Sequence, residues 1–291
     1  MDQSRKSRGL LLIAVGAISF AAVFFRSAAP THPLIQAALR LFLASLVLLP
    51  WLLSAVAKGK MSRQVLRAAL LCGVWYAIHF GAWVTSLTLT TVAASVTLVT
   101  ATPLVLGLIG WMTGKDAPLP REWGGLGLGA LGIAIIGWSD LSMGSEALKG
   151  DALALLGALG MAGYLLTCRK VAKDLDVLAF TSVATGVASL ILVCGASLWG
   201  VPLEVAGWES FFYLAAAALI PQCIGHVLLT WASRALTPVV VGTATLGEPI
   251  GAALLAWLWF SETPSVMVMG GSVVTLMGLV VALRARGAEG A

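Results

Sequence analysis

Runs of apolar residues, separated by short polar segments, follow one another along the sequence. About 20 helical residues cross the hydrocarbon core of a bilayer, and each run is long enough for one such helix. Residues 68–114 contain no Asp, Glu, Lys or Arg, too long a stretch for one helix, so we expect a hairpin that turns near Thr85–Thr91. The pattern predicts ten membrane-spanning helices, at residues 9–28, 32–53, 64–86, 90–113, 122–139, 151–168, 177–199, 210–232, 237–260 and 264–283.

The composition is that of a protein surrounded by lipid. Hydrophobic residues make up 59% of the chain and charged residues 11%, whereas soluble domains contain about 45–50% apolar and about 25% charged residues. We therefore expect an all-α integral membrane protein whose surroundings are the lipid bilayer. The net charge of +5 does not indicate a nucleic-acid partner, because the basic residues lie in the short segments between apolar runs.

The distribution of basic residues predicts the orientation of the chain. If the N-terminus is cytoplasmic, all of the 18 Lys and Arg residues except Arg26, Arg40 and Lys149 lie on the cytoplasmic side. Cytoplasmic loops of membrane proteins are enriched in these residues. The pattern thus predicts that both termini are cytoplasmic and that the protein is a multi-pass protein of the cell inner (cytoplasmic) membrane.

Two stretches of the chain share a pattern at a constant offset. The matched pairs are Pro103 and Pro249, Trp111 and Trp257, Gly124-Gly125 and Gly270-Gly271, and Gly132 and Gly278. Each half of the chain contains five predicted spans. Because five is an odd number, two similar units in series must cross the membrane in opposite directions. We expect two inverted five-helix repeats, residues 1–145 and 146–291, the usual architecture of secondary transporters.

The sequence also resembles a known family, the EamA-type, ten-span branch of the drug/metabolite transporter superfamily. The resemblance rests on a Glu-Pro…Trp…Glu…Gly-Gly…Gly motif, carried by Glu248, Pro249, Trp257, Glu262, Gly270, Gly271 and Gly278. The first half departs from it, since Thr102-Pro103 replaces Glu-Pro. The resemblance implies a cavity lined by spans 1–4 and 6–9, with spans 5 and 10 at the periphery. It also implies movement of small metabolites without ATP hydrolysis.

Ionisable residues within predicted spans are candidate functional residues, because charge is costly at membrane depth. Glu248 lies near the middle of the ninth span. Its carboxyl group is suited to bind a cationic group or carry a coupling proton; the alternative is a structural acid bonded to a neighbouring helix. Pro249 and Pro103 remove helix hydrogen bonds, so we interpret them as helix breaks or hinges that line a cavity.

His79 and His226 occupy matched positions in the third and eighth spans. Histidine is suited to relay protons or to hydrogen-bond a substrate; the alternative is a buried neutral ring that bonds a hydroxyl or carbonyl group. Inversion is expected to place one ring nearer the outer side and the other nearer the inner side. Arg40, in the second span, has three interpretations: snorkelling to the outer surface, pairing with an outer-loop acid, or binding a substrate carboxylate.

Aromatic and hydroxyl side chains complete the candidate binding residues. Trp75, Tyr76 and Tyr164 lie away from the expected interfaces, so they are suited to line a cavity, with core packing as the alternative. Thr102 and Thr245 offer polar contacts near the two prolines, or bond their own backbone. The glycines of spans 5 and 10 predict small-residue packing faces, within or between subunits.

We therefore expect a secondary active transporter of small organic metabolites, an exporter of amino acids or related compounds, that works by alternating access. We expect a monomer or homodimer, with protons as the candidate coupling ion. No cofactor, metal or catalytic residue is expected: HExxH is absent, and Ile109 stands where a Walker A motif before Lys115 needs glycine. Two alternatives stay open, a non-transporting membrane receptor or assembly subunit, and a transporter of organic cations or drugs.

Overall fold

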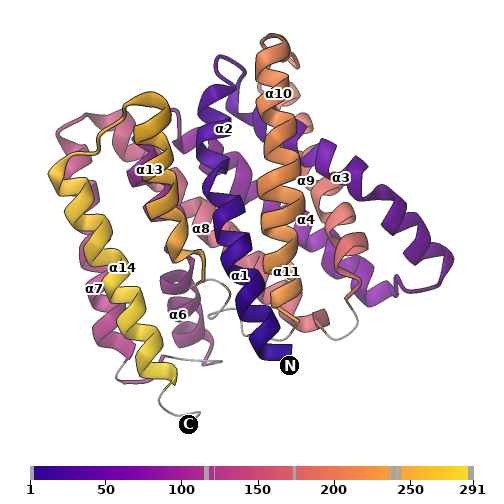
Figure 1. Ribbon diagram of the computed structural model, residues 1–291, viewed down its shortest axis with the longest axis horizontal. Coiled ribbons are helices and arrows are strands. Elements are labelled where there is room, and N and C mark those ends of the chain that lie inside the picture. The colour runs from indigo at the N-terminus through magenta and orange to yellow at the C-terminus, as the bar shows by residue number, and fades with distance from the viewer. Residues whose placement is uncertain are drawn as a thin grey trace.

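The structure, a computed structural model, is helical throughout the part of the chain that it describes (Figure 1). It describes residues 3–114, 118–120, 122–172, 175–234, 236, 241 and 244–287. The elements are α1 (Gln3–Ser19), α2 (Ala21–Ser27), α3 (Pro33–Ala57), α4 (Arg63–Ser86), α5 (Val92–Val99), α6 (Thr102–Thr113), α7 (Glu122–Leu141), α8 (Ser145–Val171), α9 (Val177–Leu198), α10 (Gly207–Ala217), η2 (Ala218–His226), α11 (Val227–Ala232), η3 (Thr245–Gly247), α13 (Glu248–Phe260) and α14 (Val266–Gly287).

Eight helical stretches in the described residues are long and apolar enough, by length and composition, to cross a membrane. They coincide with the first eight predicted spans, and the predicted hairpin turn lies between α4 and α5. Two shorter apolar helices, Thr245–Phe260 and Val266–Ala282, fall within the last two predicted spans. The start of the ninth span, at residues 237–240, 242 and 243, lies outside the described residues, as do the loop residues Lys115, Arg121 and Lys173.

Polar residues between the apolar runs determine where helices begin. The Ser62 hydroxyl accepts the N–H of Val65 at the start of α4, at 3.2 Å. The Asp176 carboxylate accepts the N–H of Ala179 at the start of α9, at 3.4 Å. Both side chains satisfy backbone donors that have no partner within the first turn of a helix. The loops therefore fix the register of the spans that follow them.

Helices from the two halves of the chain pack against each other in pairs. α7 lies along α14 at one edge of the molecule and α3 along α9 toward the other (Figure 1). α4 packs on α8, and α1 packs on η2 and α11. α4 is the third span and α8 the sixth, whereas α1 belongs to the first span and η2 and α11 to the eighth. In a five-plus-five repeat the third span corresponds to the eighth and the sixth to the first, so the two pairs are equivalent. This is the pairing that a two-fold relation between two five-helix units produces.

Glycines bring the α7 and α14 backbones into direct contact. A Cβ atom added at Gly132 would lie 2.5 Å from the carbonyl oxygen of Gly271, and one added at Gly278 would lie 2.6 Å from that of Gly125. No side chain fits at such distances, so only glycine permits this approach. The small-residue faces were predicted to pack within or between subunits. At Gly125, Gly132, Gly271 and Gly278 they pack within the chain.

The beginning of α1 and the end of α14 lie at the same end of the molecule (Figure 1). We call this the terminal end. The end of α2, the α4–α5 turn and the α13–α14 connection lie at the opposite end (Figure 1). The helices between these two ends enclose the site described next.

Candidate functional site

Two spans are broken near the middle of the molecule. α5 ends at Val99 and α6 begins at Thr102, with Pro103 in its first turn. The 3₁₀ turn η3 leads into α13, with Pro249 in its first turn. Proline fits a first turn because its missing N–H has no partner to lose there. The structure therefore places a helix break at each predicted proline, and hinge motion at these breaks stays a prediction.

Two small adjoining cavities lie beside these breaks. The first has a volume of about 30 Å³ and the second about 20 Å³. Five residues line both, namely Thr102, Met161, His226, Leu229 and Thr245. Among the predicted site residues, His79 and Glu248 line the first cavity, and Tyr76 and Tyr164 line the second. The site is thus built by both halves of the chain.

Both central cavities are too small for an organic molecule. A cavity needs roughly 10–15 Å³ of such volume to hold one water, so the larger one accommodates about two waters at most. Sites that hold small organic ligands measure about 300–1,000 Å³. Binding of an organic molecule therefore requires the surrounding helices to separate.

The two predicted histidines lie together at these cavities. Their ring centroids are 6.2 Å apart, so the expectation that inversion separates them toward opposite faces is wrong. His79 Nδ1 lies 2.8 Å from the carbonyl oxygen of Gly157. Because a carbonyl only accepts, Nδ1 carries a proton, and Nε2 is an acceptor in the neutral ring. His226 ends η2, a π-helix that contains Pro221.

Tyr76 and Tyr164 form a stacked pair beside the histidines. Their ring centroids are 4.0 Å apart and their planes differ by 3°. The hydroxyl of Tyr164 lies 2.7 Å from that of Thr230, which donates to the carbonyl of His226. Tyr164 is therefore the donor to Thr230, which has only one hydroxyl proton. This chain of contacts fixes the aromatic lining.

Arg40 is a fully buried cation behind the histidines, with 0% of its surface exposed. Its guanidinium lies over the rings of Phe80, at 4.4 Å, and Phe25, at 5.2 Å. Nη2 donates to Gln222 Oε1 at 3.0 Å, while Nε and Nη1 have no hydrogen-bond partner within the described part of the chain. Snorkelling is therefore the wrong interpretation of Arg40, and no described acid pairs with it. A substrate carboxylate remains the prediction.

Glu248 is the acidic residue among the predicted site residues. It is 8% exposed, lines the larger cavity and begins α13. A helix N-terminus stabilises negative charge, so this position suits a carboxylate. Arg40 and Glu248 interact electrostatically without forming a direct ion pair in the described residues. Glu248 lines the larger cavity, whereas Arg40 lines neither of the two cavities.

A profile of the EamA-like transporter family matches residues 7–138 and 148–284, which is most of the chain. The protein belongs to the EamA-like transporter family. It is therefore a multi-pass integral membrane protein of the drug/metabolite transporter type, with a small-molecule substrate and a lipid environment.

Structural comparison extends this assignment to the whole fold. A solved crystal structure, described only as that of a protein, superposes on this EamA-like transporter with a TM-score of 0.66. The superposition covers 96% of this chain and 98% of the other at 16% sequence identity, so it shows a shared fold. No curated protein matches the chain in sequence.

Sequence reasoning misplaced one residue of this EamA-like transporter and missed others. Trp75 lines neither cavity, and its ring instead packs on α8, where a Cβ added at Gly163 would lie 2.5 Å from the ring atom Cε2. Trp83, which was not among the predicted site residues, is buried and lines the larger cavity. Gln222 was missed because the predicted site residues were ionisable, aromatic or hydroxyl side chains and no amide was among them. The sequence feature that could have identified Gln222 is a polar amide next to Pro221 within an apolar span.

Proposed function

We propose that this EamA-like transporter is a secondary active exporter of amino acids or related compounds. In this proposal ten spans form two inverted repeats, residues 1–145 and 146–291, in the inner (cytoplasmic) membrane, with both termini cytoplasmic. Rocking of one repeat against the other exposes the central cavities to each side in turn. Their lining by both halves and the helix breaks beside them support this mechanism.

The observation that carries the substrate class is the buried, incompletely bonded guanidinium of Arg40. A buried cation without a counter-ion is costly, and its Nε and Nη1 are free in the described structure. A carboxylate accepts hydrogen bonds from a guanidinium with good geometry and neutralises its charge. Phe80 lies between Arg40 and His226, so a substrate reaches the guanidinium when the ring moves as the site opens.

The substrate's second charge is matched by Glu248. An α-amino acid carries an ammonium group beside its carboxylate, and Glu248 presents a carboxylate to the larger cavity. The aromatic rings of Tyr76, Tyr164 and Trp83 offer apolar surface for the side chain. This combination favours a zwitterion over a simple organic cation, because a cation leaves Arg40 unneutralised.

Protons are the proposed coupling ion, and His79, His226 and Glu248 are the groups proposed to carry them. A membrane potential of 100 mV contributes about 2.3 kcal/mol for each charge that crosses, enough to drive accumulation about fiftyfold. The proposal holds for a monomer or a homodimer, since all the cavity-lining groups belong to one chain.

The test is counterflow into liposomes containing the purified protein, with three molecules of one carbon skeleton: the amino acid, the amine without carboxylate, and the acid without amino group. We expect uptake of the amino acid over the amine, its loss in Arg40→Gln, and partial recovery in Arg40→Lys. Uptake of amines that is unaffected by Arg40→Gln would support an organic-cation or drug transporter instead. Saturable binding without counterflow for any class would support the receptor or assembly subunit.

A further inference from the structure

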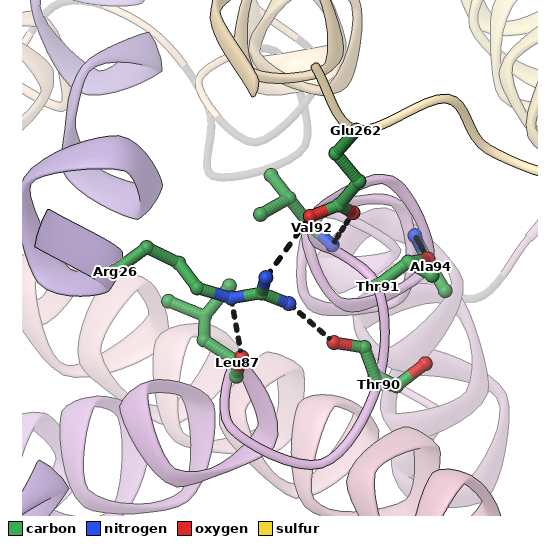
Figure 2. A network of polar contacts seen from close by, with 7 residues as sticks. All are labelled: Arg26, Leu87, Thr90, Thr91, Val92, Ala94 and Glu262. Atoms are coloured by element: carbon green, nitrogen blue, oxygen red, sulfur yellow. Dashed lines mark hydrogen bonds and ion pairs between the residues drawn. The ribbon is translucent and has the colours of Figure 1, made fainter. Parts of the chain in front are cut away.

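A polar network joins three parts of the chain at the end opposite the termini (Figure 2). Arg26, in the last turn of α2, forms an ion pair with Glu262 in the α13–α14 connection, with Nη1 and Oε2 3.0 Å apart. Its Nε donates to the carbonyl of Leu87 and its Nη2 to that of Thr90, both at 2.8 Å. The other Glu262 oxygen accepts the N–H of Val92, which begins α5, at 2.8 Å.

Every nitrogen of the Arg26 guanidinium therefore has its own acceptor. The side chains of Arg26 and Glu262 are only 30% and 17% exposed, so water screens this pair less than an open surface pair. Charge-assisted hydrogen bonds of this kind are about twice as strong as neutral ones. The network also joins the halves of the chain, because Glu262 belongs to the second half and its partners to the first.

The elements that the network joins also form walls of the larger cavity. The first span contributes Ile18 to the lining, about two helical turns before Arg26. α5 starts at the network with Val92 and ends at the cavity with Val99. α13 starts at the cavity with Glu248 and leads to Glu262. A bond between their far ends holds three cavity walls together.

We propose that Arg26 and Glu262 form the gate of the transport pathway on the face opposite the termini. Opening toward that face separates α2, α5 and α13, so it breaks the Arg26–Glu262 ion pair and the bonds of Arg26 to the α4–α5 turn. The gate is closed in this structure, which agrees with the small cavity volume. The proposal concerns access to the cavity and does not depend on which substrate is carried.

A second ion pair of the chain provides a matched control. Lys149 Nζ lies 2.6 Å from Glu146 Oε1 within α8, and both side chains are 64% exposed. This pair connects residues of one helix and joins no two cavity walls. Its loss removes a salt bridge without releasing the proposed gate.

Accessibility of a cysteine in the cavity measures the gate directly. Met161→Cys places a thiol among the lining residues, in a chain where Cys194 and Cys223 are replaced by serine; Cys72 and Cys168 are fully buried. A membrane-impermeant maleimide is applied to vesicles whose protein has a C-terminal tag, and tag protection shows which face is exposed. The same chain without Met161→Cys gives the background rate.

We expect Arg26→Gln and Glu262→Gln to increase the labelling rate from the face opposite the tag about tenfold, equivalent to 1.4 kcal/mol, and to decrease it from the tag's face. The swap Arg26→Glu with Glu262→Arg should recover part of the closed state. Glu146→Gln and Lys149→Gln should leave both rates unchanged.

Unchanged labelling in folded Arg26→Gln and Glu262→Gln overturns the proposal, as does an equal increase in the control variants. If either glutamine variant fails to elute as a single species, Arg26→Lys replaces it. Lysine keeps a charge for Glu262 but cannot bond Leu87 and Thr90 in the same planar arrangement, so a rate between wild type and the glutamine variants is expected, and a wild-type rate overturns the proposal. Because labelling needs no transported substrate, its result is separate from the counterflow result.

Discussion

Arg26 and Arg40 lie in adjacent spans of the same half, yet their surroundings are opposite. Arg26 is partly exposed and each of its guanidinium nitrogens has an acceptor. Arg40 is fully buried, lies between two aromatic rings and has two nitrogens without a partner in the described chain. A complete set of bonds indicates a contact that stabilises one conformation. A buried guanidinium with unpaired nitrogens, such as that of Arg40, indicates a group that binds a partner from outside the chain.

The largest expected effect is on substrate affinity. Arg40→Gln should raise the substrate concentration for half-maximal counterflow about a hundredfold, since a buried charged hydrogen-bond partner contributes about 2–5 kcal/mol. Arg26→Gln should change that concentration less than about threefold, because Arg26 lines no cavity. Equal losses in the two variants would contradict the distinction drawn between these arginines.

Stability should change in opposite directions at the two sites. Arg40→Met replaces an incompletely bonded buried cation with an apolar side chain of similar length, which removes the cost of burying an uncompensated charge, so we expect the free energy of unfolding to rise. Arg26→Met leaves the Glu262 carboxylate without its cation and should lower the free energy of unfolding by about 1–2 kcal/mol. Thermal unfolding of both variants in the same detergent provides the measurement. Destabilisation by Arg40→Met would indicate that Arg40 has a structural role.

Substrate should stabilise the protein only through the central arginine. A ligand at one hundred times its dissociation constant contributes about 2.7 kcal/mol to the folded state. Wild type and Arg26→Gln should therefore show a higher melting temperature with the amino acid present, and Arg40→Met should show none of this increase. An equal increase in Arg40→Met would place the bound carboxylate on another residue.

The smallest effect concerns pH at the end opposite the termini. His32 precedes α3, and its Nδ1 accepts the N–H of Leu34 at 3.3 Å. Partial burial lowers the pKa of His32 below its ordinary value of 6.5. The folded state thus disfavours the protonated ring, so this cap stabilises the protein above pH 6.5 and the contribution is lost as pH falls below that value. His32→Asn should keep the cap and remove this pH dependence in a thermal unfolding series; a slope that persists belongs to another group.

The sequence predicted those features that depend on local pattern. Apolar runs identified eight helical stretches, and the two prolines marked the helix breaks. It also selected His79, His226 and Glu248, because ionisable residues are rare in apolar spans.

Features that depend on contacts between residues far apart in the sequence could not be predicted from local pattern. Arg26 and Glu262 are 236 residues apart in the chain. In the sequence, Arg26 looks like an ordinary charge at the end of a span and Glu262 like an ordinary loop charge. The inverted repeat suggested that His79 and His226 lie at different depths in the membrane. Two matched residues that lie close to the two-fold axis are instead brought together by it. Trp75 and Trp83 show that position along a span does not reveal which side of a helix faces the cavity.

The small central volume has a consequence for the membrane as a whole. A continuous file of water across about 30 Å of hydrocarbon would conduct protons and dissipate a proton gradient across the membrane. The larger cavity holds about two waters, far too few for such a file, and the contacts of Arg26 cover it on one side. In this conformation the two central cavities are therefore too small to form a water path across the membrane.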